Sequence, residues 1–202
     1  FGTYVNAPNI NVAAAGDIVT TSGTSTIGSL TFASGFTGTL GNATRNINGN
    51  LTLVSGMSVA SGSLVNTFVG TSSHTITTAG QTLDFPIIFN GIGGTWSLQD
   101  NLTVGDTRSI QLFAGTFTTN NYAVSCGKFG GSTATGDRTL NLGSSSITCF
   151  GTTGTTASWQ VEDNGFSYTI NAGTSTIYMA EPFTGASEQY FNGGGKTYYN
   201  VV

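Results

Sequence analysis

Apolar residues alternate with small polar residues in short segments along much of the chain. These segments are residues 29–32, 50–53, 75–77, 95–98, 139–142, 146–149 and 168–171. An alternation of period two is typical of a β-strand that buries one of its faces. Pairs such as Asn48-Gly49 and Asn164-Gly165 lie between the segments and are turn signals. No segment has the spacing of an amphipathic helix, so the pattern predicts an all-β chain.

Two pairs of sequence words repeat at related distances. Residues 89–96 and 191–198 both read Phe-Asn-Gly-x-Gly-x-Thr-aromatic, and they begin 102 positions apart. Residues 50–53 and 101–104 both read Asn-Leu-Thr-apolar and begin 51 positions apart, which is half of that distance. Repeats that are nested in this way indicate a stacked unit of about 25 residues.

A shorter word points to the same kind of stacking. Gly-Thr-Ser-Thr-Ile occupies residues 23–27 and, 150 positions later, residues 173–177, with a looser copy at 143–147. The distance of 150 is close to six units, whereas the 30 positions between the last two copies require units of unequal length. A Thr- and Gly-rich chain also produces five-residue words by chance, so the eight-position match is the stronger indication of a repeat.

The repeats predict a right-handed parallel β-solenoid (β-helix) with coils of about 25 residues. A propeller blade would need about 40 to 45 residues. A β-sandwich, or a tandem pair of sandwich domains, is the alternative, because a domain of about 100 residues also explains the spacing of 102. We expect one β-repeat region over residues 1–202. The chain begins with Phe1 and ends on strand-like residues, so we expect an excerpt of a longer polypeptide.

The composition narrows the choice of partners. Charged residues make up only 7 % of the chain, against about a quarter in an average protein. The five Lys and Arg residues are scattered and the formal net charge is −4, which argues against a nucleic-acid partner, because phosphates must be neutralised. No apolar run approaches the roughly 20 residues that span a bilayer, so membrane insertion is not expected.

Cys126 and Cys149 are the two cysteines, and their separation of 23 positions is about one coil. On adjacent coils they would occupy equivalent positions, with Cα atoms near enough for a disulfide. A pair of stacked buried thiols is the other interpretation, because parallel side chains on neighbouring strands are poorly placed to bond. The chain has no Cys-x-x-Cys motif and no His/Cys cluster, so neither zinc nor another cofactor is expected.

The nine acidic residues do not form an evident catalytic pair. Glu162 and Asp163 are adjacent and would point to opposite faces of a strand, which does not suit a glycosidase. Asp84, Asp106 and Asp137 lie within three or four expected coils, and they would form a calcium or sugar-cleaving site only if the fold brought them to one face. We therefore expect that the chain is not an enzyme.

Large aromatic side chains with a polar end are candidates for stacking on the sugar rings of a surface glycan. Trp159, Tyr122 and Tyr190 are expected in this role, and burial in the core is the alternative. Trp96 and Tyr198 share one position of the 102-residue repeat, which favours a structural role for both.

Thr-x-Thr occurs six times, starting at residues 24, 37, 75, 116, 133 and 174. A regular array of such pairs on one flat face would be able to match an ice surface. The starts are unevenly spaced, and no single coil length fits them. We therefore expect solvated strand threonines and no array.

Three longer words carry a family resemblance. They are residues 115–122 (GTFTTNNY), 138–145 (RTLNLGSS) and 191–200 (FNGGGKTYYN). Over roughly residues 89–202 the chain resembles repeat-rich bacteriophage tail-fibre and spike proteins and virion surface proteins. The resemblance implies an extracellular appendage on the virion surface, commonly a homotrimer, that joins other virion proteins and binds a host surface glycan.

The expected function is that of a structural or adhesive segment of a viral fibre, spike or related appendage. Such a segment acts as a rigid shaft or as a body that binds the host surface. A polysaccharide-degrading spike enzyme is one alternative, and it needs acids that converge in a groove. A bacterial adhesin or self-assembling filament subunit is the other, because such proteins use similar β repeats with little charge.

Overall fold

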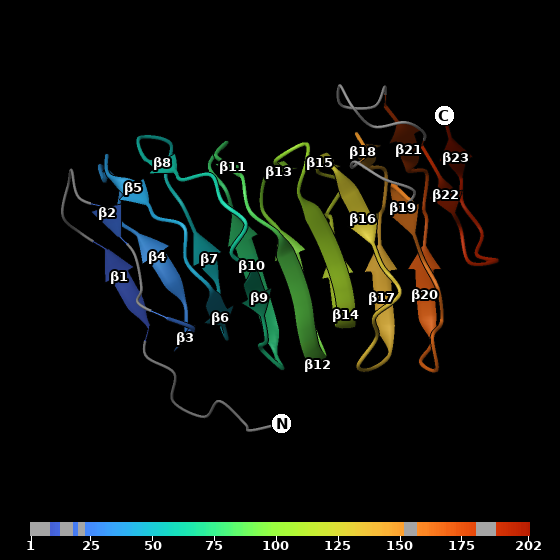
Figure 1. The fold of residues 1–202 in the computed structure, drawn as a ribbon, viewed down its shortest axis with the longest axis horizontal. Helices are drawn as coiled ribbons and strands as arrows, with labels where there is room; N and C mark the ends of the chain where they lie inside the picture. Colours follow the sequence, from blue (N-terminus) through green and yellow to red (C-terminus); the bar gives the residue numbers. More distant parts are fainter. Residues whose placement is uncertain (1–8, 13–17, 20–22, 152–156, 181–188) are drawn as a thin grey trace.

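The computed structural model describes residues 9–12, 18–19, 23–151, 157–180 and 189–202. Over these residues the chain forms short β-strands and no helix, which confirms the expected all-β class. Every pairing between the described strands is parallel. Figure 1 shows the strands standing side by side in one long row from the N-terminal to the C-terminal end of the molecule.

The chain winds as a three-sided solenoid, because each strand pairs with a strand of the next coil. The first face contains β1 (Ile10–Val12), β4 (Leu30–Phe32), β7 (Leu51–Thr52), β10 (Ser73–Thr77), β17 (Arg138–Asn141) and β20 (Tyr168–Asn171). The second face contains β3 (Ser25–Ile27), β6 (Arg45–Ile47), β9 (Asn66–Phe68), β16 (Lys128–Gly130), β19 (Trp159–Gln160) and β22 (Phe191–Asn192). Two longer strands run from the second face into the first and join them, β12 (Ile87–Leu98) and β14 (Ser109–Thr118).

The third face consists of two sheets that follow one another along the solenoid (Figure 1). The N-terminal sheet contains β2 (Ile18–Val19), β5 (Thr39–Leu40) and β8 (Ser58–Val59). The C-terminal sheet contains β11 (Thr82–Leu83), β13 (Leu102–Val104), β15 (Val124–Cys126), β18 (Ser146–Cys149), β21 (Thr176–Met179) and β23 (Asn200–Val201).

About eight coils are stacked, and a typical coil has about 22 residues, slightly fewer than the 25 expected. Individual coils differ: the chain advances 19 residues between the paired residues Thr39 and Ser58, and 32 between Trp159 and Phe191. The predicted parallel β-solenoid is therefore confirmed. The sandwich alternative is wrong, because a sandwich is built from antiparallel sheets.

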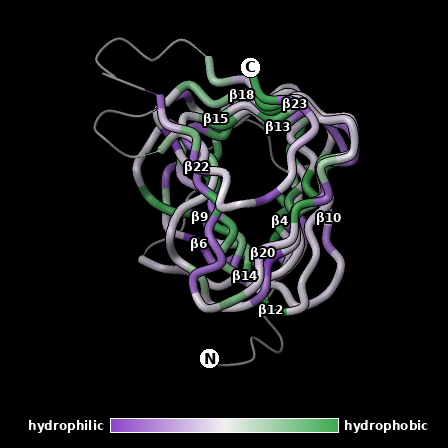
Figure 2. Tube along the Cα trace, turned by 90° about the vertical axis from the view of Figure 1, so that its right-hand side faces the viewer, coloured by the Kyte–Doolittle hydropathy of each residue, from purple (hydrophilic) through white to green (hydrophobic). Residues whose placement is uncertain are grey.

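Inward-pointing side chains from all three faces form one continuous core around the solenoid axis, along which Figure 2 looks. Phe68, Phe89 and Phe117 stack in successive coils, with ring centroids 5.2 and 4.6 Å apart. Phe129 and Trp159 stack in the same way at 4.7 Å. Aromatic rings at these separations contribute attraction beyond the burial of their area. The core is therefore filled by stacking between the register partners Phe68 and Phe89 and the partners Phe129 and Trp159, and by stacking of Phe89 on Phe117 across the corner.

Glycines build the corner between the second and first faces. Register shifts around Asn90 let β12 bend while it stays paired with β14. Gly93 has a φ of +78°, a conformation that favours glycine. A Cβ atom on Gly91 would collide with the carbonyl oxygen of Gly70 in the preceding coil. Asn90-Gly91 and Gly93-Gly94 are turn signals, which predict two separate strands, whereas the structure has a bend within one strand.

The longest sequence echo is offset from the structural repeat by two residues. The pairings from β12 through β14, β16 and β19 to β22 connect Ile87 with Phe191, four coils later. Phe89, which the echo aligns with Phe191, lies two positions further along β12. Trp96 lies on the first face, whereas Tyr198 follows β22 and packs on a ring of the second face. The expectation that Trp96 and Tyr198 share a repeat position is wrong.

Among the echoes of sequence words, only the one at 30 positions is a coil step. Residues 50–53 belong to the first face and residues 101–104 to the third, so the echo at 51 joins unlike positions. Residues 23–27 and 173–177 likewise lie on different faces. Residues 143–147, in contrast, are in register with 173–177 through Ser146 and Thr176. Short sequence words of small polar residues therefore recur more often in this chain than structurally equivalent positions do.

The aromatic stack predicts a strong dependence of stability on its central ring. Phe117→Ala is expected to lower the free energy of unfolding by about 3 to 5 kcal/mol, because the fully buried ring leaves a cavity. Thr116→Ala, a neighbouring substitution on the outward side, is expected to cost less than about 1 kcal/mol. Denaturant unfolding followed by circular dichroism measures both. Equal losses for the two variants would contradict the described orientation of β14.

Candidate functional site

The outward side of the third face carries a row of hydroxyl groups. Thr82, Thr103, Ser125 and Thr148 are in register on β11, β13, β15 and β18, and Tyr178 of β21 continues the row. Neighbouring parallel strands are about 4.8 Å apart, so the hydroxyls follow one another at about that interval. The row offers hydrogen-bond donors and acceptors without charge.

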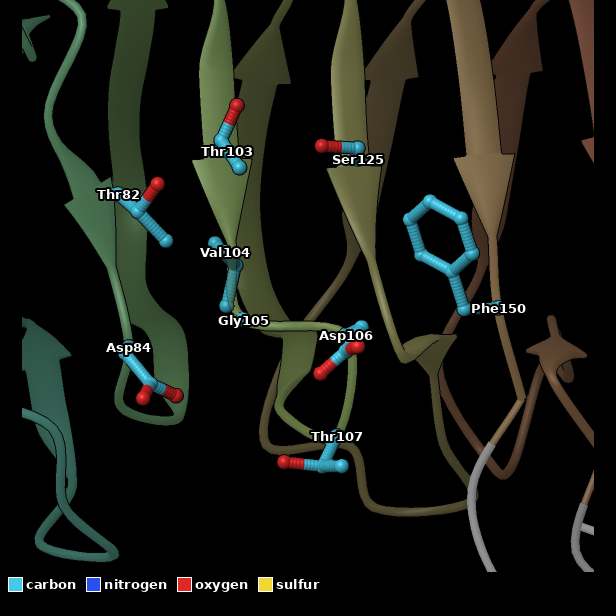
Figure 3. A pocket seen from close by; sticks show the side chains of 9 residues that line it. All are labelled: Thr82, Asp84, Thr103, Val104, Gly105, Asp106, Thr107, Ser125 and Phe150. Atoms are coloured by element: carbon cyan, nitrogen blue, oxygen red, sulfur yellow. The ribbon is translucent and has the colours of Figure 1, made fainter. Parts of the chain in front are cut away.

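A hollow of about 390 Å³ lies where the row meets the corner that leads to the second face (Figure 3). Thr82, Thr103 and Ser125 line it from the strands, and the acidic residues Asp84 and Asp106 line it from the segments after them. Phe150 completes the wall at the other end.

The residues that directly follow β11, β13, β15 and β18 differ in size along the hollow. They are Asp84, Gly105, Gly127 and Phe150, one in each of four successive coils. The two middle coils have no side chain at this position. The Asp84 carboxylate and the Phe150 ring stand at opposite ends of the hollow with Asp106 between them, as Figure 3 shows.

Arg108 holds Asp84 at one side of the hollow. Its Nε donates a hydrogen bond to Asp84 Oδ1 at 2.8 Å, and its Nη2 donates to Ser61 Oγ at 3.3 Å. A Cβ atom on Gly105 would collide with Asp84 Oδ1, so glycine leaves room for the ion pair. Hydrogen bonds from Ser61 and from Arg108 lower the pKa of Asp84. Asp84 is therefore a fixed, ionised acceptor at neutral pH.

Asp106 presents a second carboxylate to the same hollow. It lies in a turn that is closed by the Arg108 amide, which donates to the Gly105 carbonyl oxygen at 2.7 Å. The Asp106 side chain is exposed, and it takes part in neither of the two ion pairs between described residues. Its oxygens are thus available to a ligand.

Three other acids among the described residues make contacts at corners of the solenoid. Asp137 Oδ1 accepts a hydrogen bond from the Ser167 amide at 2.9 Å, away from the hollow. Glu162 Oε1 accepts from two amide side chains, and Asp163 Oδ1 lies 2.6 Å from Lys196 Nζ. The structure therefore brings together two of the three acids named from the sequence, Asp84 and Asp106, and keeps Asp137 apart. Within the described residues, no three His, Cys, Asp or Glu side chains are grouped closely enough to hold a metal ion.

Cys126 and Cys149 are directly paired in register on β15 and β18. Both side chains are buried and both are free thiols. A hydrogen bond with Cys149, followed by burial, raises the pKa of Cys126 well above its usual value. The two sulfur atoms thus belong to the core of the third face, behind the hydroxyl row.

The three aromatics expected to stack on glycans have different environments. Trp159 is fully buried between Phe129 and Phe191, so the expected glycan contact is wrong for this residue. Its Nε1 donates to Tyr198 Oη at 3.1 Å, inside the fold.

Tyr122 and Tyr190 are partly exposed, at 37 and 42 %. Tyr122 precedes the third face, whereas Tyr190 precedes the second face, so they lie at different corners of the coil. They do not form a shared stacking platform, and neither lines the hollow.

Threonines form a more regular array on the first face than their spacing in the sequence suggests. Ser73, Thr95, Thr116, Thr139 and Thr169 are in register over five coils. A second rank lies two residues further along each strand and consists of Thr75, Ser97, Thr118, Asn141 and Asn171. The Thr-x-Thr pairs themselves lie on different faces of the solenoid, in agreement with the expectation that they form no array. The ranks are formed by other residues, which corners of variable length keep in register. Only one of the six Thr-x-Thr pairs, the pair at 116, has a member in each rank, whereas Thr77 of the pair at 75 belongs to neither.

Sequence reasoning missed Arg108, Gly105 and Phe150 as residues of a site. Gly105, Asp106 and Arg108 follow an apolar strand end within four positions, which is the available signal for a charged corner. Phe150 gives no such signal, because an apolar residue directly after a strand is normally interpreted as a buried core residue.

Comparisons with protein-family models, with curated proteins and with solved structures find no match for this chain. In the part of the chain that the structure describes, no helix is long and apolar enough to cross a membrane. The geometry of the chain's own residues is therefore the basis for the functional argument.

Thiol accessibility tests the placement of the two cysteines. At pH 8 the folded chain is expected to react with almost no dithionitrobenzoate, because both thiols are buried and the pKa of Cys126 is raised. Unfolding in guanidinium chloride without a reductant should expose two reactive thiols. Failure to detect any thiol after unfolding would show that the cysteines are bonded.

The ion pair at the hollow predicts a pH dependence of stability. Because the pKa of Asp84 is lowered in the folded state, its charge stabilises the fold above the unfolded pKa of about 3.9, and this contribution is lost as the pH falls through the folded pKa. Asp84→Asn should therefore be less stable than the natural chain at pH 7, and the difference should shrink at pH 2 to 3. Urea unfolding across this range measures it. Arg108→Gln should reduce the effect, and a difference that does not change with pH would contradict the assignment.

Proposed function

We propose that this chain is a non-enzymatic, rigid and adhesive segment of an extracellular appendage of the viral fibre or spike kind. It serves as a shaft whose surface contacts the host. The chain assembles as a homo-oligomer, with a trimer favoured. The oligomer is joined to other virion proteins on the outside of the particle. The continuous parallel ladder over about eight coils is the observation that carries the proposal.

The ladder supports a mechanical role. Hydrogen bonds between coils run along the long axis on all three faces, so bending the rod in any direction would stretch the bonds on its convex side. The core has the same continuity, since the aromatic stacks pass from coil to coil without a break at Phe68, Phe89 and Phe117. Such a body transmits force and holds a contact surface at a fixed distance from its base.

The surface supports an adhesive role that does not depend on charge. The outward positions of the first and third faces are mostly Thr, Ser and Asn, and the described residues make only two ion pairs. Salt screens interactions between exposed charges, with a Debye length of about 8 Å at physiological ionic strength. Adhesion through neutral hydroxyl and amide groups is therefore expected to persist as the salt concentration rises.

A polysaccharide-degrading enzyme is the second candidate, because Asp84 and Asp106 line one hollow. Asp84 is occupied by Arg108, which favours the ionised form, whereas a general acid must keep its proton near neutral pH. The single histidine, His74, lies in β10 on the first face beside Ser72 and Trp96. These positions favour adhesion over hydrolysis.

A bacterial adhesin or filament subunit would also need a rigid, elongated body, so the fold does not distinguish it from a virion protein. The location of the protein does distinguish the two. Mass spectrometry of purified virions and of cell-wall fractions is expected to find the parent polypeptide in the virions. Mass photometry of the isolated chain tests for the trimer. Release of reducing ends from host polysaccharide, lost in Asp84→Asn or Asp106→Asn, would overturn the non-enzymatic assignment, and recovery only from cell walls would overturn the viral one.

A further inference from the structure

We propose that the hollow on the third face binds a neutral saccharide, one or two sugar rings in length. This inference rests on the adhesive part of the proposed function and names its ligand class and its site. Asp84, Asp106, Phe150 and the hydroxyls of Thr103 and Ser125 are the contacts that the geometry points to.

The dimensions of the hollow suit a ligand of this size. Asp84 and Phe150 are three coil steps apart, which at about 4.8 Å per step places their backbones about 14 Å from each other. The volume of about 390 Å³ is within the range of small-molecule sites, about 300 to 1,000 Å³. Gly105 and Gly127 occupy the intermediate positions, where the Asp84 carboxylate lies over Gly105 and the Asp106 backbone lies over Gly127, so Asp84, Asp106 and Phe150 bound the hollow.

The chemistry along the hollow changes from polar to apolar. The Asp84 and Asp106 carboxylates are acceptors for hydroxyl donors, and hydrogen bonds to an ionised acceptor are about twice as strong as neutral ones. The half-buried Phe150 ring stands beside Ser125 at the other end (Figure 3). A sugar ring has hydroxyls around its edge and an apolar C–H face, so one ligand would use both ends.

The charge of the site selects against anionic ligands. Arg108 neutralises Asp84 through the 2.8 Å ion pair and is already bonded on two of its nitrogens. Asp106 has no ion-pair partner among the described residues and leaves the hollow with one net negative charge. A uronic or sialic acid would therefore be repelled, whereas a neutral hydroxyl-rich ligand would not.

Saturation-transfer NMR on the full 202-residue chain tests the inference, with maltose, cellobiose, lactose and chitobiose as separate neutral probes. At least one probe is expected to receive saturation and to shift backbone amide signals of Thr103, Ser125 and Phe150. Phe150→Leu keeps apolar bulk and removes the ring, and it should weaken that probe's binding at least tenfold. Asp106→Asn should also weaken binding at least tenfold, because the substitution removes the charged acceptor.

Tyr178→Ala is the matched control, because this exposed tyrosine belongs to the same sheet but lies outside the hollow. It should leave binding unchanged. No binding of any probe, binding that survives both Phe150→Leu and Asp106→Asn, or tighter binding of galacturonic acid than of the neutral probes would each overturn the inference. If mass spectrometry assigns the chain to cell walls and the chain still binds a neutral probe, the viral assignment is wrong and the saccharide site is supported. Failure of the proposed function can therefore be distinguished from failure of the saccharide inference.

Discussion

The parallel hydrogen-bond ladder between successive coils is the interaction on which the rest of the structure depends. It keeps like positions in register, and a slip of one residue would turn the core side chains of a strand outward. Because register is kept, equivalent side chains of successive coils lie next to one another and can interact. Inside, the rings of the register partners Phe68 and Phe89 stack, and so do those of Phe129 and Trp159. Outside, Asn171 Nδ2 donates to Asn141 Oδ1 at 2.7 Å, and Asn141 Nδ2 donates to Thr118 Oγ1 at 3.0 Å.

The ladder constrains the strands and leaves the corners free, which decides where specific chemistry is found. Coil lengths from 19 to 32 residues are accommodated at the corners, either between strands or at the bend within β12. Corners are therefore the positions at which a glycine, a charged residue or an aromatic ring is accepted without loss of register. The hollow illustrates this, since Asp84, Gly105 and Phe150 follow strand ends that are otherwise alike. Functional residues in many folds lie on such connecting segments above a rigid scaffold.

The fold class was predictable from the sequence because alternation and turn residues report directly on local structure. The coil length was predictable only approximately. Echoes at 102, 51 and 150 positions join residues that are not equivalent, such as Leu51 on the first face and Leu102 on the third. All three faces are built largely from the same few residue types, Thr, Ser, Asn and Leu. Similar short sequences therefore occur at positions that are not structurally equivalent. The spacing of 23 between Cys126 and Cys149, with no long word match to support it, is a true coil step.

Local patterns in the sequence by themselves determined the strands, their inward residues and the neutral character of the outward ones, because these features depend on neighbours in the chain. Only the tertiary structure decided which coils meet. It placed Asp84 beside Arg108, 24 residues later, and enclosed Trp159 between two phenylalanine rings. It also buried Arg138, whose Nη2 donates to the carbonyl oxygens of Glu162 and Asp163 at 2.6 and 2.7 Å. These contacts depend on corner lengths, and no local pattern of residues specifies how corners of unequal length bring distant side chains together.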